Sequence, residues 1–181
     1  MKKALHLIPI LAILVIGCQG DKSESGSGTA GTQTTGSTGA PAEHVDSLQR
    51  TYHLKDLERV TLKANGHDIS AWVMDTEGKR REGMMFLTAE DVSDNDGMIF
   101  VFPDSTQRSF WMDNTILALD IIYISEHKVV LNIQEGKPFD KTSLPSIGNA
   151  MYVLEMKQGS AKRLGIKPGM QIAIPDSVKG K

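Results

Sequence analysis

The sequence feature that most constrains the fold is the apolar run Met98–Phe102. Asn95-Asp96-Gly97 precedes the run as a turn signal, and Pro103 ends it. Consecutive apolar side chains, some β-branched and some aromatic, are typical of a strand that is buried on both faces. Such a strand lies in the interior of a sheet. The domain is therefore predicted to be built around a sheet with this segment near its centre.

Turn residues predict two hairpins around this strand. Asn65-Gly66 is the strongest two-residue hairpin signal, and it divides Val60–Val73 into two β-prone runs. Glu126-His127 separates two more apolar runs, and further strands are predicted downstream. The runs are Leu119–Ser125, Lys128–Gln134, Ala150–Met156 and Met170–Ile174.

Helical signals are few. Ser160–Gly165 has a capping Ser, two cations in its last turn and a terminal Gly, which predicts one short helix. Asp75–Gly83 is predicted to be a short helix or a loop, because Gly78 disfavours a helix. We therefore predict an α+β, mostly β domain: a small antiparallel, barrel-like or strongly curved sheet with one or two short helices.

The first residues predict an exported protein. Lys2 and Lys3 precede an apolar run that is long enough for a secretory signal and short for a membrane span, so residues 1–17 are predicted to be a signal peptide. Val15–Cys18 resembles the lipobox of bacterial lipoproteins. That resemblance implies cleavage before Cys18 and acylation of this residue, palmitate included. An ordinary signal peptide, or a membrane helix with a chance cysteine, is the alternative.

The expected location is the cell envelope, with the membrane as a partner through the lipid on Cys18. By resemblance to lipoprotein sorting, Gln19 favours the outer membrane where the envelope has two membranes. Residues 18–52 are predicted to be a disordered tether, whose Gly-, Ser- and Thr-rich part of about 25 residues would span about 25–30 Å. A single folded domain is expected over residues 53–176, and a disordered tail over residues 177–181.

Charge and cysteine content narrow the classes of function. Lys and Arg total 20 against 22 Asp and Glu, so the chain lacks the basic excess that nucleic-acid binding requires. Cys18 is the only cysteine, which leaves no intramolecular disulfide and no zinc site built on cysteines. The histidines are scattered along the sequence, and neither a metal nor a cofactor is predicted.

The stretch Arg108–Asp120 concentrates polar and aromatic side chains between apolar segments. A Trp beside a carboxylate suits the rim of a cleft, where the flat indole contacts a sugar or another planar ligand. We predict a shallow site here for a small-molecule, glycan or protein ligand. Its residues would be Arg108, Trp111, Asn114 and Asp120. The structural alternative is a turn at Asn114-Thr115 that Asp120 pins through backbone amides.

Carboxylates in and near this stretch raise a second possibility. Asp113 and Asp120 are the candidate pair for acid–base hydrolysis, which uses two carboxyl groups roughly 5–10 Å apart. No nucleophile–base pair accompanies them, so catalysis is the less favoured interpretation. Glu155 is predicted to be partly buried and to form a structural ion pair with Arg81 or Arg108.

The segment Val60–Ile174 resembles the bacterial and archaeal family known as domain of unknown function one-ninety-two. The family usually has Arg where this chain has Leu87 and Lys where it has Asp113, and the missing cations disfavour an anionic ligand. The resemblance implies a small, mainly β domain without an established activity. The matching residues are Gly83–Phe86, Gly97–Phe102, Phe110–Thr115, Leu119–Ile122, Tyr152–Glu155, Gly159 and Leu164–Gly169.

These observations predict a membrane-tethered bacterial envelope lipoprotein whose domain is a non-catalytic ligand-binding or interaction module. Two alternatives stay open at this point. One is a weak hydrolase of envelope polymers that uses the carboxylate pair, and the other is a purely structural envelope protein.

Overall fold

The computed structural model describes residues 49–181. The predictions for the signal peptide, for Cys18 and for the tether as far as residue 48 lie outside these residues. Among the described residues, no helix is both long and apolar enough to cross a membrane. The elements are η1 (Leu54–Asp56), β1 (Arg59–Ala64), β2 (His67–Met74), α1 (Glu77–Glu82), β3 (Asp96–Thr106), β4 (Ser109–Phe110), β5 (Leu119–Ile124), β6 (Val130–Gly136), β7 (Leu144–Pro145), β8 (Ala150–Lys157) and α2 (Ser160–Arg163).

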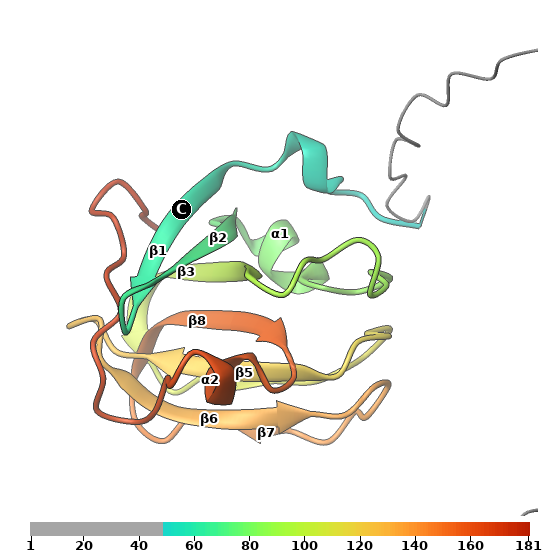
Figure 1. Cartoon of the computed structure of the whole chain (residues 1–181). Helices are drawn as coiled ribbons and strands as arrows, with labels where there is room; N and C mark the ends of the chain where they lie inside the picture. The colour runs from blue at the N-terminus through green and yellow to red at the C-terminus, as the bar shows by residue number, and fades with distance from the viewer. Residues whose placement is uncertain (1–48) are drawn as a thin grey trace, which may run out of the picture. The chain divides into compact units, whose positions relative to one another are not determined.

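Six strands form one sheet in the order β1-β2-β3-β8-β5-β6, and β4 pairs separately with β7 (Figure 1). The predicted central strand is β3, which lies between β2 and β8. The mostly β, α+β class is confirmed. Neighbouring strands are antiparallel except β2 and β3, where the prediction of an antiparallel sheet is wrong. Residues 75–95, which include α1, carry the chain back so that β3 starts beside β2 in the same direction.

Both predicted hairpins are present. Asn65 and Gly66 connect β1 to β2 with φ values of 48° and 79°, the positive values that a type I′ turn requires. β5 and β6 form the second hairpin. The predicted last strand is reduced to isolated bridges, in which Gln171 pairs with Val129 and Ala173 with Lys63 of β1.

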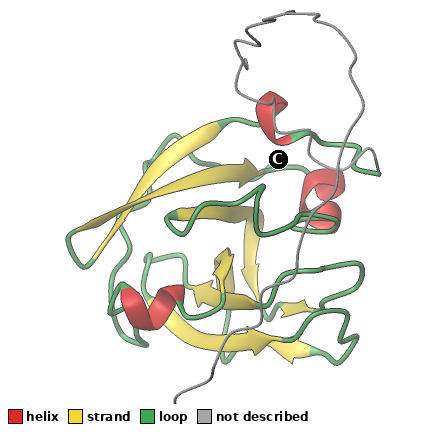
Figure 2. Ribbon diagram, turned by 45° about the vertical axis from the view of Figure 1, so that its right-hand side comes forward, coloured by secondary structure: helices red, strands yellow, loops and turns green. Residues whose placement is uncertain are grey.

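The curved sheet does not close on itself (Figures 1 and 2). The bridges at residues 171 and 173 instead tie the segment after α2 to both sides of the opening between β1 and the start of β6.

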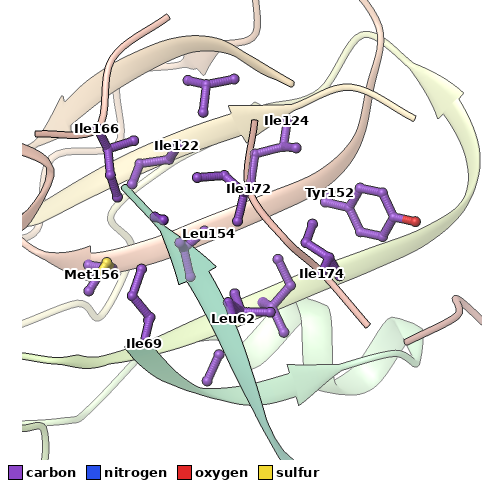
Figure 3. Packing of buried hydrophobic residues seen from close by; sticks show 14 of the residues in the cluster. Leu62, Ile69, Ile122, Ile124, Tyr152, Leu154, Met156, Ile166, Ile172 and Ile174 are labelled. Carbon is purple, nitrogen blue, oxygen red and sulfur yellow. The ribbon is translucent and has the colours of Figure 1, made fainter. Parts of the chain in front are cut away.

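Buried side chains form two clusters, one on each face of the sheet. Alternation along β5 directs Ile122 and Ile124 into one cluster and Ile121 and Tyr123 into the other. The first cluster is completed by α2 and the segment that follows it. Figure 3 shows Ile166, Ile172 and Ile174 of that segment among the side chains of this cluster. The second cluster is completed by loop residues that include Met84, Leu87, Val92, Met112 and Leu117.

The folded part extends beyond the limits expected from the sequence. Arg50 is buried, and its guanidinium donates hydrogen bonds to the carbonyls of Gly83 (2.9 Å) and Met85 (2.6 Å). At the other end, Val178 is buried in the first cluster, and the backbone N–H of Lys181 donates to the carbonyl of Asp75 (2.9 Å). The expected domain start at residue 53 and the expected disordered tail at 177–181 are therefore corrected. Both segments are polar in sequence, and each is held by a few anchoring residues.

Candidate functional site

A cavity of about 530 Å³ opens on the face of the sheet that carries the second cluster. One wall is formed by α1 and the loop that follows it, and the other by β3, β4 and the loop before β7. Four aromatic residues line the cavity: Phe100, Phe102, Phe110 and Trp111. Charged residues from α1, β8 and the loop before β7 line it as well: Glu77, Arg80, Arg81, Glu82, Lys141 and Glu155.

The aromatic wall is rigidly packed on its inner side and open at its outer end. The rings of Phe100 and Phe110 meet edge to face at 4.9 Å between centroids, and Phe110 meets Tyr123 in the same way at 6.0 Å. The Tyr123 hydroxyl donates to the carbonyl of Leu144 on β7. Trp111 follows β4 directly and is 53% exposed. The cavity therefore has a fixed aromatic floor and a solvent-facing indole at its mouth.

Backbone hydrogen bonds between three loops hold this mouth together. The N–H of Phe86 donates to the carbonyl of Asn114 (2.9 Å), and the N–H of Phe139 donates to the carbonyl of Thr115 (3.1 Å). Phe86, Asn114 and Phe139 have φ values of 65°, 52° and 60°. Asn adopts positive φ values more readily than other residues with a side chain, whereas Phe rarely does. Such conformations cost free energy, and they gather at functional sites.

Glu155 provides the most unusual carboxyl group of the cavity. It lies on β8 and is only 5% exposed, and its Oε2 atom has no hydrogen-bond partner among the described residues. Burial raises the pKa of Glu155 to about 8, although the backbone N–H of Met84 and the positive charge of Arg50 act in the opposite direction. At neutral pH this side chain is therefore mostly a neutral carboxylic acid.

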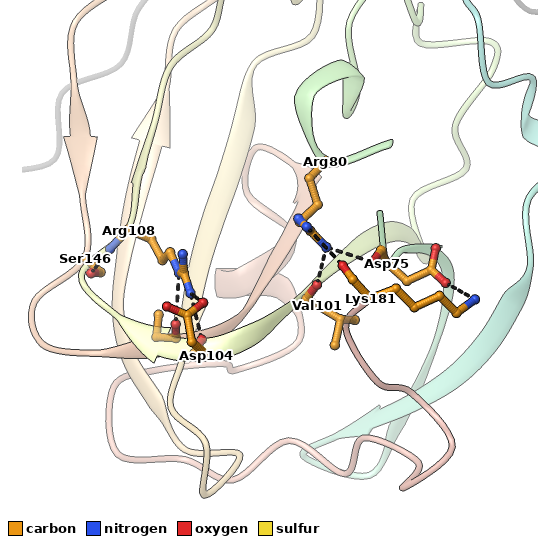
Figure 4. Close-up of polar contacts among 8 residues, drawn as sticks. Asp75, Arg80, Val101, Asp104, Arg108, Ser146 and Lys181 are labelled. Carbon is orange, nitrogen blue, oxygen red and sulfur yellow. Dashed lines mark hydrogen bonds and ion pairs between the residues drawn. The ribbon is translucent and has the colours of Figure 1, made fainter. Parts of the chain in front are cut away.

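The predicted ion pair between Glu155 and Arg81 or Arg108 is wrong. Arg108 donates to the carboxylate of Asp104 (2.6 Å) and to the carbonyl of Ala150 (3.3 Å) (Figure 4). Arg81 is exposed, on the rim of the cavity. The cation whose charge acts on Glu155 is Arg50, which lies outside the domain limits that the sequence suggested.

Two arginines pack against Phe102, one of the aromatic residues of the cavity. The guanidinium carbon of Arg108 lies 3.9 Å from the centroid of this ring, and that of Arg80 lies 5.1 Å away. Arg80 is fixed in turn by hydrogen bonds of 2.8 Å to the carbonyls of Asp75 and Val101 (Figure 4). Arg108 therefore belongs to the packing around the cavity, whereas Trp111 lines it.

The structure separates the other predicted site residues. Asn114 forms the turn at the mouth, where the N–H of Thr115 donates to the carbonyl of Met112 (3.2 Å). Asp120 does not pin this turn. Its Oδ2 accepts the N–H of Ala161 (2.8 Å) at the start of α2. Alternation along β5 places Asp120 on the face opposite Tyr123, and the sheet therefore lies between Asp120 and the cavity.

The proposed carboxylate pair for hydrolysis does not come together. Asp113 forms an ion pair with Lys141 (2.9 Å) beside the cavity mouth, while Asp120 is buried against α2. No group of three or more His, Cys, Asp or Glu residues is placed to hold a metal ion within residues 49–181.

Sequence reasoning missed several residues of the cavity. Lys141 lies in a polar loop that carries no motif, and Arg50 lies in the segment expected to be a tether. Phe100 and Gly83 were within matched motifs, but nothing in the sequence brought them beside Glu155. The signal for Glu155 itself was visible, because a carboxylate within an apolar strand needs an explanation.

Comparisons with known proteins identify relatives of unknown activity. Residues 60–174 match the model of the family DUF192, described as "Uncharacterized ACR". A protein of unknown function from Novosphingobium aromaticivorans DSM 12444 has a similar structure, with 35% identity over 80% of this chain and 100% of that chain, and a TM-score of 0.61. A structure described as a putative transcription regulator from Sinorhizobium meliloti 1021 has 30% identity over 63% of this chain and 90% of that chain, with a TM-score of 0.58.

No curated protein matches the chain. The matched family segment begins at the second residue of β1 and ends just after the bridge formed by residue 173, so it includes the sheet apart from Arg59 and every residue that lines the cavity. This chain belongs to the DUF192 family of uncharacterised proteins.

Proposed function

We propose that this protein is a lipid-tethered protein of the bacterial envelope whose domain binds a small, partly apolar ligand without catalysing a reaction. The observation that carries the proposal is the cavity of about 530 Å³ with its aromatic wall and half-exposed Trp111. Its volume lies in the range of small-molecule sites, roughly 300–1,000 Å³, which are mostly apolar with a few polar groups. The separation of Asp113 from Asp120 supports binding over hydrolysis.

Ligand binding is tested with 3-phenylpropanol, a neutral molecule with one ring and one hydroxyl. The full chain with Cys18→Ser, in a non-ionic detergent, is titrated by calorimetry and by Trp fluorescence. We expect saturable binding that weakens about tenfold in Trp111→Ala, because an aromatic contact contributes about 1.4 kcal/mol, or one factor of ten. Ile147→Ala is the matched control, since Ile147 is 72% exposed and does not line the cavity.

The ligand-site proposal fails if 3-phenylpropanol binds without saturation. It also fails if Trp111→Ala and Ile147→Ala have the same affinity as the parent chain.

The membrane tether is tested separately through Cys18. The support for it is the signal-like run of residues 1–17, the lipobox ending in Cys18 and the polar segment that follows. Cells expressing the full chain are labelled with radioactive palmitate and fractionated. We expect the label and the membrane association of the chain to be lost in Cys18→Ser. Persistence of both in this variant would rule out an anchor at this residue.

A further inference from the structure

We propose that the ligand presents a hydrogen-bond acceptor, a carbonyl or carboxylate oxygen at the end of an aromatic or apolar body, to the carboxyl group of Glu155. This inference rests on the proposed function and specifies which chemistry the cavity selects. It is carried by the position of an unpartnered, buried carboxyl group in an aromatic cavity.

The strand register explains why Glu155 faces the cavity. On β8 it stands between Met98 of β3 and Ile121 of β5, and both of these side chains belong to the second cluster. Nearly all buried polar atoms in proteins have a hydrogen-bond partner. The Oε2 atom of Glu155 has none among the described residues, which leaves one hydrogen-bonding position of this group for a bound molecule.

Gly83 keeps side-chain atoms away from the edge of Phe100 and the carboxyl group of Glu155. A Cβ atom at this position would lie 3.4 Å from Oε2 of Glu155 and 3.0 Å from Cζ of Phe100. Any other residue at position 83 would therefore fill the gap between the ring and the carboxyl group. Gly83 has φ +49° and lines the cavity.

The groups that face Glu155 favour an acceptor over a cation. Arg50 faces it from the N-terminal segment and Tyr123 from β5, and the Met84 N–H donates to it from the loop after α1. From β3 it meets Met98, which does not titrate. The nearby Glu82 carboxylate is occupied by the backbone N–H groups of Thr51 and Tyr52, at 2.6 and 2.9 Å.

The protonation state of Glu155 also favours a ligand that accepts a hydrogen bond. A neutral carboxylic acid donates a hydrogen bond through its O–H group, so the ligand group that fits it is a hydrogen-bond acceptor. An ammonium ligand would require Glu155 to ionise, and it would meet Arg81 and Lys141 at the rim. Arg81 lines the same cavity and is a cation that a carboxylate ligand can face, although the two family cations are absent at positions 87 and 113.

The test compares three probes of one shape: 3-phenylpropanoate, 3-phenylpropanamide and 3-phenylpropylamine. At pH 7 we expect the first two to bind at least tenfold more tightly than the amine. Above pH 8 the affinity for 3-phenylpropanoate should fall about tenfold per pH unit, because only the protonated fraction of Glu155 donates. Glu155→Gln should keep the pH 7 affinity, since its amide N–H also donates, and should remove the loss above pH 8.

Glu135→Gln is the control, because Glu135 is exposed on β6 and does not line the cavity. This variant should retain both the pH 7 affinity and the loss above pH 8. Tighter binding of the amine, or affinity for the propanoate that does not change above pH 8 in the parent chain, overturns the acceptor proposal. The comparison of the probes and the pH dependence are both measured on the parent chain, so they do not depend on whether a variant folds. If 3-phenylpropanol binds at Trp111 while these results appear, the proposed function stands and only the ligand class is wrong.

Discussion

Replacing Glu155 with Gln should change how the stability of the domain depends on pH. The carboxyl group has a pKa of 4.5 when exposed to water and about 8 in the fold, because burial disfavours its charge. Between these two values the unfolded chain has lost the proton and the folded chain keeps it. The unfolded state therefore binds fewer protons, and the free energy of unfolding falls as pH rises.

The size of the effect follows from the shift in pKa. The fall is about 1.4 kcal/mol per pH unit, so the parent chain should lose about 4 kcal/mol between pH 5 and pH 8 through this group. Above pH 8 the dependence on this group ends, because both states are then ionised. Against a typical stability of about 5–15 kcal/mol, the loss is large. A glutamine side chain cannot ionise, so the Glu155→Gln variant should lack this component of the pH dependence.

Urea unfolding of both chains, followed by Trp fluorescence at half-unit steps from pH 4.5 to pH 9, measures this difference. The quantity of interest is the stability of the variant minus that of the parent, because all other titrating groups cancel in it. We expect this difference to rise by about 4 kcal/mol and then to level off near pH 8. Glu135→Gln supplies the control and should give a flat difference. A flat difference for Glu155→Gln as well would refute a buried, protonated Glu155.

Three further predictions concern residues outside the cavity. Burial acts to raise the pKa of Asp75, but hydrogen bonds from Lys181 and Lys79 outweigh it and lower the pKa to about 2. The stability that this group contributes above pH 4 should therefore be lost as pH falls toward 2, by about 1–2 kcal/mol given the exposure of Lys181. Asp75→Asn should abolish this loss in acid unfolding curves. Asp120→Ala removes the acceptor for the Ala161 N–H and should cost about 1–3 kcal/mol in urea unfolding with no change in affinity for 3-phenylpropanol; a change in that affinity would link Asp120 to the site. Gly66→Ala, at φ 79°, should lower the free energy of unfolding by about 1 kcal/mol, whereas an unchanged urea midpoint would argue against the type I′ turn.

Local signals were sufficient to predict most of the sheet. The Asn65-Gly66 turn, the apolar run at Met98–Phe102 and the strand at Ala150–Met156 each depend on patterns within a few residues. Each is present, although β3 (Asp96–Thr106) continues past Pro103, where the predicted strand ended. The parallel pairing of β2 with β3 was not predictable in this way. It depends on how residues 75–95 return the chain, and that segment has no strong periodicity.

The cavity was predicted only at its rim. Trp111 was correctly predicted to line the site, because an indole beside a carboxylate is unusual for a core position. Asp120 was wrongly placed at the site, because its closeness in sequence suggested that it stabilises the same turn. Alternation along β5 instead directs it to the other face. Arg50 and Glu155 are 105 positions apart in the sequence, and only the fold brings the charge of one to the other. Contacts of this kind carry no local signal.

Strained backbone conformations and unpaired buried polar atoms are concentrated in one part of the domain. Among the non-glycine residues with positive φ, Asn65 and Lys128 lie in hairpin turns, where the turn geometry accounts for them. The other three, Phe86, Asn114 and Phe139, lie in the loops that meet at the cavity mouth. The buried oxygen of Glu155 lies at the same cavity, whereas the buried Asp120 on the opposite face has a good partner. A fold selected for stability alone would remove such costs, and they persist where function requires them. Their coincidence at one cavity supports the proposal that a ligand binds there.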